Sequence, residues 1–152
     1  MRAPRIAFIG GLYHVTCRCN NREFLFEDEY DFRIYLKILV KAKELYGVLV
    51  HAYCLTNNHT HLLISTPGRN SLSLFMQYVN GGFAKIYNLR HGRTGRFWGA
   101  RFYSTVIESH SQFFNTVFYI EANMVRCRAV EHLADWKWSS YLVHAHGKAD
   151  PV

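Results

Sequence analysis

The sequence predicts an α+β fold: a ferredoxin-like split βαβ antiparallel sheet with helices on one face, followed by a C-terminal helix. Segments with a strand-like period alternate with segments with a helical period, in the order β-α-β-β-α-β and then α. Only a polar corner, Asn57-Asn58, separates the second and third strands, so they are expected to pair antiparallel. The first and third strands are central in a sheet of this kind.

The first strand is predicted over residues 12–19, where apolar and polar side chains alternate. One face would hold Tyr13, Val15 and Cys17, and the other would hold His14, Thr16 and Arg18. This alternation is typical of a strand with one buried face, because successive side chains of a strand point in opposite directions. The chain is expected to turn at residues 20–22.

The first helix is predicted to begin near Glu27, where the hydrophobic pattern changes from alternation to a helical stripe. Acidic residues at positions 27–29 suit the start of a helix, and Gly47 suits its end. The second strand is predicted over residues 48–56 and the third over residues 59–66.

A second helix, a fourth strand and a third helix complete the predicted order. Asn70 or Ser71 can cap the second helix, and residues 102–107 are expected to form the fourth strand. Ser111 is expected to cap the third helix, which is predicted to run to about Val130.

The tail, from about residue 131 to residue 152, contains Trp136, Trp138 and Tyr141. These aromatic side chains predict a short helical segment that packs back on the rest of the protein. The sequence shows no internal repeat or linker, so residues 1–152 are expected to form one domain.

The chain has 152 residues and a net charge of +7, and 49% of its residues are hydrophobic. This composition is that of a folded protein and excludes a disordered chain. The basic balance favours a polyanionic partner, either nucleic acid or an acidic membrane surface. No run approaches the roughly 18 apolar residues of a membrane span, and the N-terminal apolar stretch is too short for a secretory signal. We therefore expect a cytoplasmic protein with reduced cysteines.

His59 and His61 open the third strand, two positions apart. Side chains at i and i+2 of a strand share a face, so the pair presents two imidazoles side by side, which is half of a metal site. On this motif alone, two surface or core histidines explain the spacing as well as a metal site does.

Tyr119 lies on the single small and polar strip of an otherwise apolar third helix. Within roughly 60° of Tyr119, the strip also contains Gln112, Asn115, Thr116, Ala122, Asn123 and Arg126. The strip can be the solvent face of the helix. It can also form a site with His59 and His61, because the Asn123 amide oxygen completes a mixed set that suits Mg²⁺ or Mn²⁺, although imidazole also accepts softer ions. Tyr119 would then be a nucleophile, since a phenol is protonated at neutral pH and needs a nearby base or metal.

Residues 90–101 are rich in glycine and arginine, with two aromatic side chains between the arginines. Arginine binds phosphate, and Phe97 and Trp98 can stack on unpaired bases. The predicted DNA-binding residues are Arg93, Arg96, Trp98 and Arg101, with Arg18 and Arg22 near the end of the first strand. Packing in the core explains Trp98 equally well.

Several motifs, spread over nearly the whole chain, resemble one family. They are His59-Thr-His61, Tyr119-Ile-Glu-Ala-Asn123, Tyr13-His-Val-Thr-Cys-Arg-Cys-Asn20, Arg93-Thr-Gly-Arg-Phe-Trp98 and Trp138-Ser-Ser-Tyr141. The sequence resembles the HUH single-strand endonucleases, and among them the Y1 transposases of the IS200/IS605 type. The insertion-sequence branch typically has Gln one turn after the tyrosine, so Asn123 indicates the REP-associated tyrosine transposase branch.

This resemblance implies a metal-dependent single-stranded DNA endonuclease and strand transferase, a transposase. His59, His61 and Asn123 would hold a divalent ion, Mg²⁺ or Mn²⁺, and Tyr119 on the C-terminal helix would attack the DNA phosphate to form a 5′-phosphotyrosine. The partner implied is single-stranded DNA near palindromic or hairpin elements, which places the protein near the nucleoid. A monomer is expected, with a dimer as the alternative, and no organic cofactor is expected.

Two residues depart from the family pattern. Thr60 stands where the HUH motif usually has a bulky apolar residue, but it is expected to face away from the site. Met124 follows Asn123 where the family usually has proline, and without proline the helix is free to continue past Asn123.

Two other functions are considered from the residues. A non-catalytic protein that binds single-stranded DNA or RNA hairpins would explain the basic loop, but it would leave Tyr119, Asn123 and the paired histidines without a role. A phosphodiesterase of the two-histidine type would use His14-Val-Thr16, but the sequence lacks the second His-x-Thr copy in the required form. His14 is more simply expected to pack or assist beside the metal site from the neighbouring strand.

Overall fold

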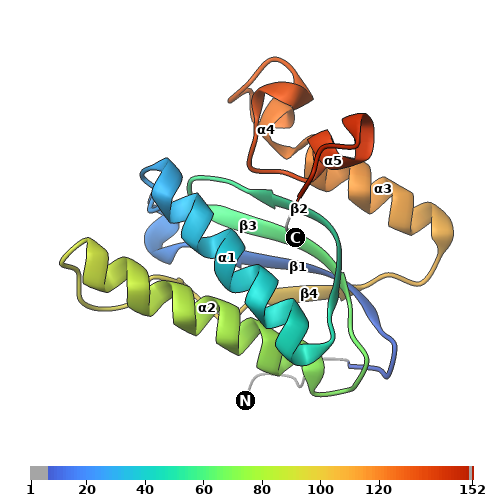
Figure 1. Cartoon of the computed structure of the whole chain (residues 1–152), viewed down its shortest axis with the longest axis horizontal. Coiled ribbons are helices and arrows are strands. Elements are labelled where there is room, and N and C mark those ends of the chain that lie inside the picture. Colours follow the sequence, from blue (N-terminus) through green and yellow to red (C-terminus); the bar gives the residue numbers. More distant parts are fainter. Residues whose placement is uncertain (1–6, 151) are drawn as a thin grey trace.

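A four-stranded antiparallel sheet forms the centre of the computed structural model, which describes residues 7–150 and 152 (Figure 1). The strands lie in the order β2-β3-β1-β4. Their bounds are Leu12–Arg18 for β1, Leu49–Leu55 for β2, His59–Ser65 for β3 and Tyr103–Val106 for β4. This order confirms the predicted α+β fold, with β1 and β3 in the centre of the sheet.

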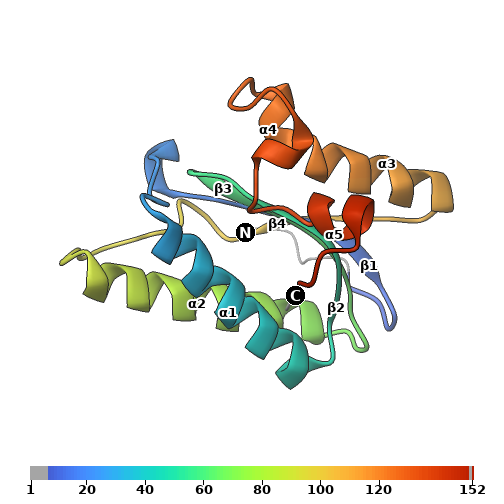
Figure 2. The same ribbon diagram turned by 45° about the horizontal axis from the view of Figure 1, so that its top comes forward.

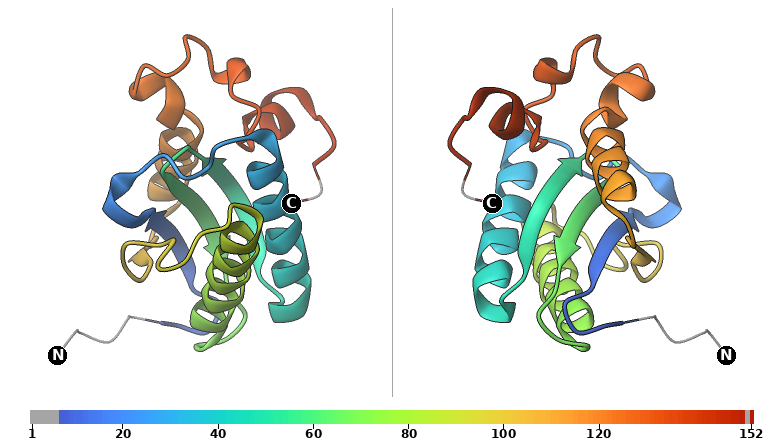
Figure 3. Two further views of the ribbon diagram at one scale, coloured as in Figure 1. Left: turned by 90° about the vertical axis from the view of Figure 1, so that its left-hand side faces the viewer. Right: turned by 90° about the vertical axis from the view of Figure 1, so that its right-hand side faces the viewer.

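Helices lie on both faces of the sheet (Figure 3). The first two, α1 (Glu29–Tyr46) and α2 (Ser71–Arg90), pack together on one face, and α3 (His110–Glu121) lies on the other. The larger core lies beneath α1 and α2 and includes Tyr13, Val15, Cys17, Tyr35, Leu39, Phe75 and Phe83. The polar face of β1, which includes His14, turns toward α3. None of the helices in the described part of the chain is long and apolar enough to cross a membrane.

The ends of α1 follow the signals that predict them. The Asp28 carboxylate accepts hydrogen bonds from the backbone N–H groups of Tyr30 and Asp31, at 2.9 and 3.0 Å, and so caps the helix. Gly47 ends the helix in the left-handed conformation, with φ at 62°. Glycine adopts this conformation without steric penalty, which explains its place there.

The start of α3 differs from its prediction. Ser109 is the cap, because its hydroxyl accepts a hydrogen bond from the Gln112 N–H at 3.2 Å. Ser111 lies inside the helix, so its prediction as the cap was wrong. Two serines, two positions apart, offer the same side chain, and the backbone decides which of them is extended, as a cap must be.

The end of α3 also differs from its prediction. The helix ends at Glu121 and a separate turn, α4 (Asn123–Arg126), follows, so the prediction of one helix to Val130 was wrong. The break coincides with contacts from the tail. The buried Glu121 carboxylate accepts a hydrogen bond from Ser140 Oγ at 2.7 Å and pairs with His144 Nδ1 at 2.6 Å. These long-range contacts leave no mark in the periodicity of the helix itself.

The tail lies along the free edge of β2 (Figure 2). Its short helices are η2 (Leu133–Asp135) and α5 (Tyr141–His146). The Leu55 N–H donates to the Trp138 carbonyl at 2.9 Å, and the Ser140 N–H donates to the Tyr53 carbonyl at 3.0 Å. The Trp136 indole N–H donates to the Leu55 carbonyl at 2.8 Å. The tail thus satisfies backbone groups that an uncovered edge strand would expose.

Candidate active site

Two histidines lie side by side on β3, on the face of the sheet that carries α3. In the antiparallel pairing of β1 with β3, His61 is opposite Thr16 and His59 is opposite Arg18. The centroids of the His59 and His61 rings are 4.9 Å apart and the rings are nearly perpendicular, at 85°. His61 is buried and His59 is half-buried. The strand thus presents both imidazoles to one site, as the alternation of side chains predicts.

Asn123 reaches the same two rings from the turn that follows α3. Its amide nitrogen, Nδ2, lies 3.2 Å from Nε2 of His61. Its side chain also forms a hydrogen bond with His59. Asn123 is the first residue of α4, so the break in the helix comes directly before it. A single amide therefore joins both imidazoles.

The protonated nitrogen of His59 is fixed by its neighbours. Nδ1 of His59 lies 2.6 Å from the Asn58 amide oxygen and 2.9 Å from the Thr56 hydroxyl. An amide oxygen only accepts hydrogen bonds, so Nδ1 must carry the proton. The lone pair of the neutral ring is then on Nε2, which is left for a ligand.

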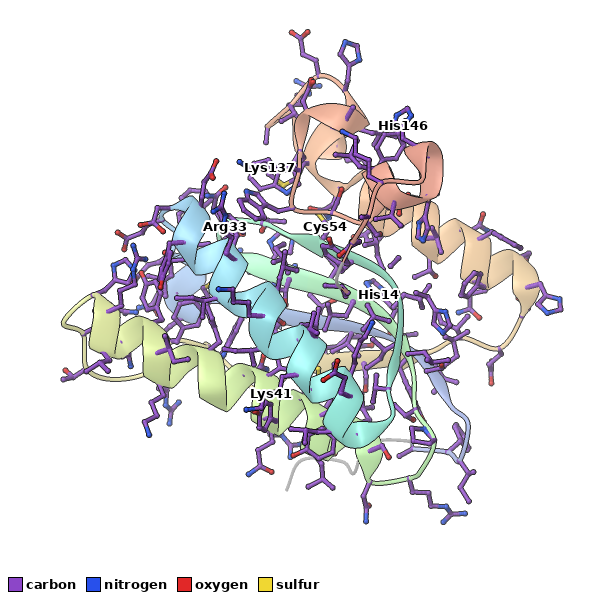
Figure 4. All side chains as sticks on the ribbon, viewed as in Figure 1. His14, Arg33, Lys41, Cys54, Lys137 and His146 are labelled. Atoms are coloured by element: carbon purple, nitrogen blue, oxygen red, sulfur yellow. The ribbon has the colours of Figure 1, made fainter. Side chains whose placement is uncertain are left out.

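His61 is held in the same way by β1. Its Nδ1 lies 2.9 Å from Nε2 of His14 and 3.2 Å from the Thr16 hydroxyl. His14, labelled in Figure 4, therefore supports His61 from the neighbouring strand. Because Nδ1 is engaged there, Nε2 of His61 is the nitrogen that faces Asn123.

Burial keeps these imidazoles neutral. It is the main cause that lowers the pKa of His61 to about 3, with smaller contributions from the nearby histidines and two arginines. Burial also lowers the pKa of His59 and that of His14 from the usual 6.5. All three rings are therefore neutral at pH 7, and the neutral ring is the form that binds a metal ion.

The site fits a divalent metal ion. The available donors are Nε2 of His59, Nε2 of His61 and the Asn123 amide, in which a rotation of the group exchanges nitrogen and oxygen. Two imidazole nitrogens and one amide oxygen form a mixed set that leaves positions open for phosphate oxygens and water. Across residues 7–150 and 152, no group of three or more His, Cys, Asp or Glu side chains is arranged to hold an ion. The amide of Asn123 is therefore needed to complete the set.

Tyr119 lies next to the histidines on α3. Its ring centroid is 5.7 Å from that of His61 and 5.8 Å from that of His14, and the residue is 38% exposed. The guanidinium carbon of Arg126 lies 4.4 Å from the centroid of the Tyr119 ring. A phenol, two imidazoles, an amide and a guanidinium thus meet at one accessible site within a single chain.

The arginine-rich loop, residues 90–101, is held against the end of β1. The Asn20 N–H donates to the Phe97 carbonyl at 2.7 Å, and the Gly99 N–H donates to the Arg18 carbonyl at 3.0 Å. A Cβ atom on Gly99 would lie 3.2 Å from the Cys19 carbonyl oxygen, so glycine permits this close approach. The loop is therefore fixed at the end of β1, the strand that pairs with the histidines of β3.

The predicted DNA-binding side chains differ in their surroundings. Four are exposed: Arg18, Arg22, Arg96 and Arg101. Arg93 is half-buried, with its guanidinium carbon 5.8 Å from the centroid of the Tyr87 ring. Trp98 is also half-buried, and its indole N–H donates to the Asn80 carbonyl at 3.0 Å. A hollow of about 400 Å³, here called the basic hollow, is lined by Arg96, Trp98, Gly99, Ala100 and Arg101. Trp98 is thus anchored in the core while part of it lines an open surface.

Phe97 does not lie on the surface. It is 1% exposed, and its ring lies 4.7 Å from that of Tyr87 and 5.0 Å from that of Phe83, between centroids. The expectation that Phe97 stacks on unpaired bases was therefore wrong. The backbone hydrogen bond from Asn20 to Phe97 holds the loop close to the core at this residue, and the apolar Phe97 ring is buried there.

The variant Phe97→Ala is expected to lower the free energy of unfolding by about 3–5 kcal/mol, because it removes a buried ring and leaves a cavity. Urea unfolding, followed by circular dichroism, measures this loss. Phe114 is 68% exposed, and Phe114→Ala should change the same free energy by less than about 0.5 kcal/mol. Equal losses in the two variants would contradict the placement of Phe97 in the core.

Thr60 faces away from the two histidines, as expected. It is 1% exposed, and its Oγ1 lies 3.4 Å from the hydroxyl of Tyr35 on α1. Burial raises the pKa of Tyr35 far above its usual range, so its hydroxyl stays protonated. A polar residue between the histidines therefore satisfies a buried hydroxyl that an apolar residue would leave without this partner.

Three contributors to the site were missed from the sequence. Thr56 and Asn58 orient His59, but they were expected only to end a strand and form a corner. Arg126 was placed on the strip of Tyr119 without a role. Its spacing, seven residues and about two helical turns after Tyr119, is the signal that could have identified it.

The sequence matches a known family and a curated relative. Residues 9–123 match the family model "Transposase IS200 like". The chain is also similar to a protein of Haemophilus influenzae (strain ATCC 51907 / DSM 11121 / KW20 / Rd) that is provisionally named a REP-associated tyrosine transposase. The two are 27% identical over an alignment that covers 93% of this chain and 84% of that protein.

Two solved structures share the fold. One is a REP-associated tyrosine transposase bound to a REP hairpin, with a TM-score of 0.78 and 21% identity over 99% of this chain and 89% of that chain. The other is a protein of Deinococcus radiodurans R1, provisionally described as a transposase, with a TM-score of 0.54 and 16% identity over 76% of this chain and 92% of that chain. At these identities the similarity shows the fold alone.

Proposed function

Because the chain belongs to the IS200-like transposase family, we propose that it is a metal-dependent single-stranded DNA endonuclease and strand transferase that cuts near DNA hairpins. The observation that carries this proposal is the meeting of Tyr119 with His59, His61 and Asn123 at one accessible site. The REP hairpin bound by a structurally similar transposase supports hairpin DNA as the substrate.

Tyr119 is the proposed nucleophile. Its hydroxyl oxygen forms a bond to the scissile phosphorus, and the bond from that phosphorus to the 3′-oxygen breaks. The proton lost by the phenol balances the proton gained by the leaving oxygen. The products are a 5′-phosphotyrosine and a free 3′-hydroxyl. Because the number of phosphoester bonds is unchanged, a second 3′-hydroxyl can reverse the step and transfer the strand without ATP.

His59, His61 and Asn123 are the residues that would hold Mg²⁺ or Mn²⁺. When bound, such an ion polarises the phosphate and stabilises the charge that develops on the leaving oxygen. His14 and Thr16 support this arrangement, because they hold the His61 ring with Nε2 toward the site. The protein must also bring the scissile phosphate of the DNA next to the Tyr119 hydroxyl.

Arg126 and Arg18 supply positive charge at the site, since both contribute to the lowered pKa of His61. Arg126 lies over the Tyr119 ring, where its guanidinium can attract the incoming phosphate. Arg18 is opposite His59 in the sheet, and its carbonyl binds Gly99 of the arginine-rich loop. A DNA strand that runs from the basic hollow past Arg18 to Tyr119 would meet an arginine at each of these places.

Replacing Arg96 and Arg101 together by alanine is expected to weaken binding to hairpin DNA of any sequence. The slope of log affinity against log salt should fall by about 2, one for each lost phosphate contact. Fluorescence anisotropy titrations at several salt concentrations measure the slope. Lys41, labelled in Figure 4, is exposed on α1, which lies on the face of the sheet away from His59, His61 and α3 (Figure 3), so Lys41→Ala should leave the slope unchanged. An unchanged slope in the arginine double variant would place the DNA elsewhere.

The chain is proposed to act as a monomer with Tyr119 working in cis. Tyr119 already lies beside the histidines of its own chain, so no second copy is needed to complete the site. A DNA substrate also favours a location at the nucleoid of the cytoplasm.

The direct test is incubation with a single-stranded hairpin that carries a label at its 3′ end, with and without Mn²⁺. The proposal expects an ion-dependent covalent product in which the labelled fragment is attached to the protein. Binding of the hairpin without an adduct at any ion concentration would instead support the alternative, a non-catalytic hairpin-binding protein.

A further inference from the structure

A second hollow, of about 390 Å³, lies beside Tyr119 over the N-terminal part of α3. It is here called the α3 hollow and is lined by His14, Ser111, Gln112, Asn115, Thr116 and Tyr119. Four of these residues precede Tyr119 on the helix, whereas the metal-binding Asn123 follows it. The Tyr119 ring is therefore shared between the proposed cleavage site and this hollow.

The chemistry of the α3 hollow differs from that of the basic hollow. Its lining consists of amides, hydroxyls and two aromatic rings, with no arginine or lysine among these residues. A phosphate is usually held by cationic side chains, which this lining does not offer. A neutral group with several hydrogen-bond donors and acceptors fits it better, and in DNA that group is a base. The His14 and Tyr119 rings add flat surfaces of the kind on which bases pack.

Two of the polar side chains are committed to the fold. The Gln112 amide oxygen accepts a hydrogen bond from the Glu108 N–H at 2.9 Å, and its nitrogen donates to the Val106 carbonyl at 3.4 Å. The Thr116 hydroxyl donates to the Gln112 carbonyl at 2.7 Å. These bonds fix one wall of the hollow, so it keeps its shape without a ligand.

Asn115 remains available for recognition. It is exposed, and within the described part of the chain no hydrogen bond, ion pair or ring contact involves its side chain. Its amide offers a donor and an acceptor side by side. This is the arrangement with which asparagine recognises a base edge through two hydrogen bonds.

We propose that the α3 hollow binds the unpaired base next to the scissile phosphate, and that Asn115 reads its edge. The inference rests on the proposed function, because it places the phosphate at Tyr119. A nucleotide joined to that phosphate must lie beside the Tyr119 ring, and the α3 hollow adjoins this ring. Asn115 thus determines which base is accepted at the cleavage position, while the basic hollow binds DNA of any sequence.

The test compares Asn115→Ala with the unchanged protein on hairpins that carry each of the four bases directly 5′ or 3′ of the cleaved bond. For each hairpin, the rate constant of adduct formation is measured with Mn²⁺ and divided by the dissociation constant of that hairpin. The unchanged protein should prefer one base at one of the two positions. Asn115→Ala should reduce this preference by about tenfold, the effect expected when a paired contact to one base is lost. Hairpins that carry the other three bases should bind and react as before, and Mn²⁺ affinity should be unchanged.

Asn70→Ala is the matched control, because Asn70 is exposed at the start of α2 and its side chain forms no capping hydrogen bond. It should retain the full preference. An unchanged preference in Asn115→Ala, or no preference at either position in the unchanged protein, would overturn the inference while adduct formation still supported the proposed function. If the unchanged protein forms no adduct at all, the proposed function itself fails.

Discussion

Replacing Tyr119 by phenylalanine is expected to abolish covalent attachment to DNA while binding to hairpin DNA persists. The substitution removes one hydroxyl and keeps the ring that contacts Arg126 and His14, so the surroundings change little. Without the nucleophile no phosphotyrosine can form, and the rate of adduct formation should fall by at least about a thousandfold. With a 3′-end label, the adduct appears on a denaturing gel as labelled DNA that migrates with the protein.

Tyr103 provides the control for this experiment. It is 71% exposed on β4, more than Tyr119 at 38%, so accessibility alone would make it the better nucleophile. Tyr103→Phe should nevertheless form the adduct at the normal rate. Tyr103 is opposite Thr16 on β1, so a whole strand separates it from His61, whereas the Tyr119 ring contacts the His61 ring directly. A Tyr119→Phe protein that still forms the adduct at the normal rate would refute the assignment.

A mixture of two inactive variants tests whether Tyr119 acts in cis. Tyr119→Phe retains the histidines, and His61→Ala retains the tyrosine. If each chain contains a complete site of its own, mixing the two variants restores no activity. Restored activity would mean that the tyrosine of one chain works with the histidines of another, as in a dimer with shared sites.

The sequence predicts the strand half of the site well. Alternation along β1 and β3 depends only on backbone geometry, so it places His59 and His61 on one face and Thr60 on the other. The helical strip likewise relates Tyr119 to Asn123 one turn later. These are short-range regularities, and a single sequence contains them in full.

The parts that the sequence does not predict depend on contacts between distant segments. The break before Asn123 accompanies the binding of Glu121 by Ser140 and His144 of the tail. The burial of Phe97 follows from the backbone hydrogen bond between Asn20 and the arginine-rich loop. Periodicity describes one segment at a time, so it cannot reveal which other segment will supply a partner.

Replacing His61 by alanine is expected to weaken Mn²⁺ binding by at least about a hundredfold, and DNA cleavage should be lost with it. His61 is the proposed ligand held most firmly, since it is buried and His14 and Thr16 engage its Nδ1. Loss of outer partners alone typically costs about 10–100-fold in metal affinity, so loss of the ligand itself should cost at least the upper end of that range. Isothermal titration calorimetry with Mn²⁺ measures the affinity without reference to cleavage.

His51 is the matched control for His61. It also lies on the sheet, on β2, where its Nε2 lies 2.9 Å from the Ser65 hydroxyl. His51→Ala should retain normal Mn²⁺ affinity. Removal of the ion from the unchanged protein with a chelator should stop cleavage, and Mn²⁺ should restore it. Full cleavage by His61→Ala, or by the unchanged protein after complete chelation, would contradict the metal role.

Two substitutions of Asn123 test whether the third ligand of the metal ion is an oxygen atom. Asn123→Ala should weaken Mn²⁺ binding, because it removes the amide and leaves two imidazoles. Asn123→Asp should retain the binding, because the carboxylate offers an anionic oxygen at the same position and Mn²⁺ and Mg²⁺ prefer oxygen ligands. Equal affinity in both variants would mean that the amide only bridges the two histidines, as its hydrogen bonds to them already allow. The two substitutions therefore distinguish two roles of Asn123 that the structure alone permits equally: a ligand of the metal ion, or a hydrogen-bonding partner of the two histidines.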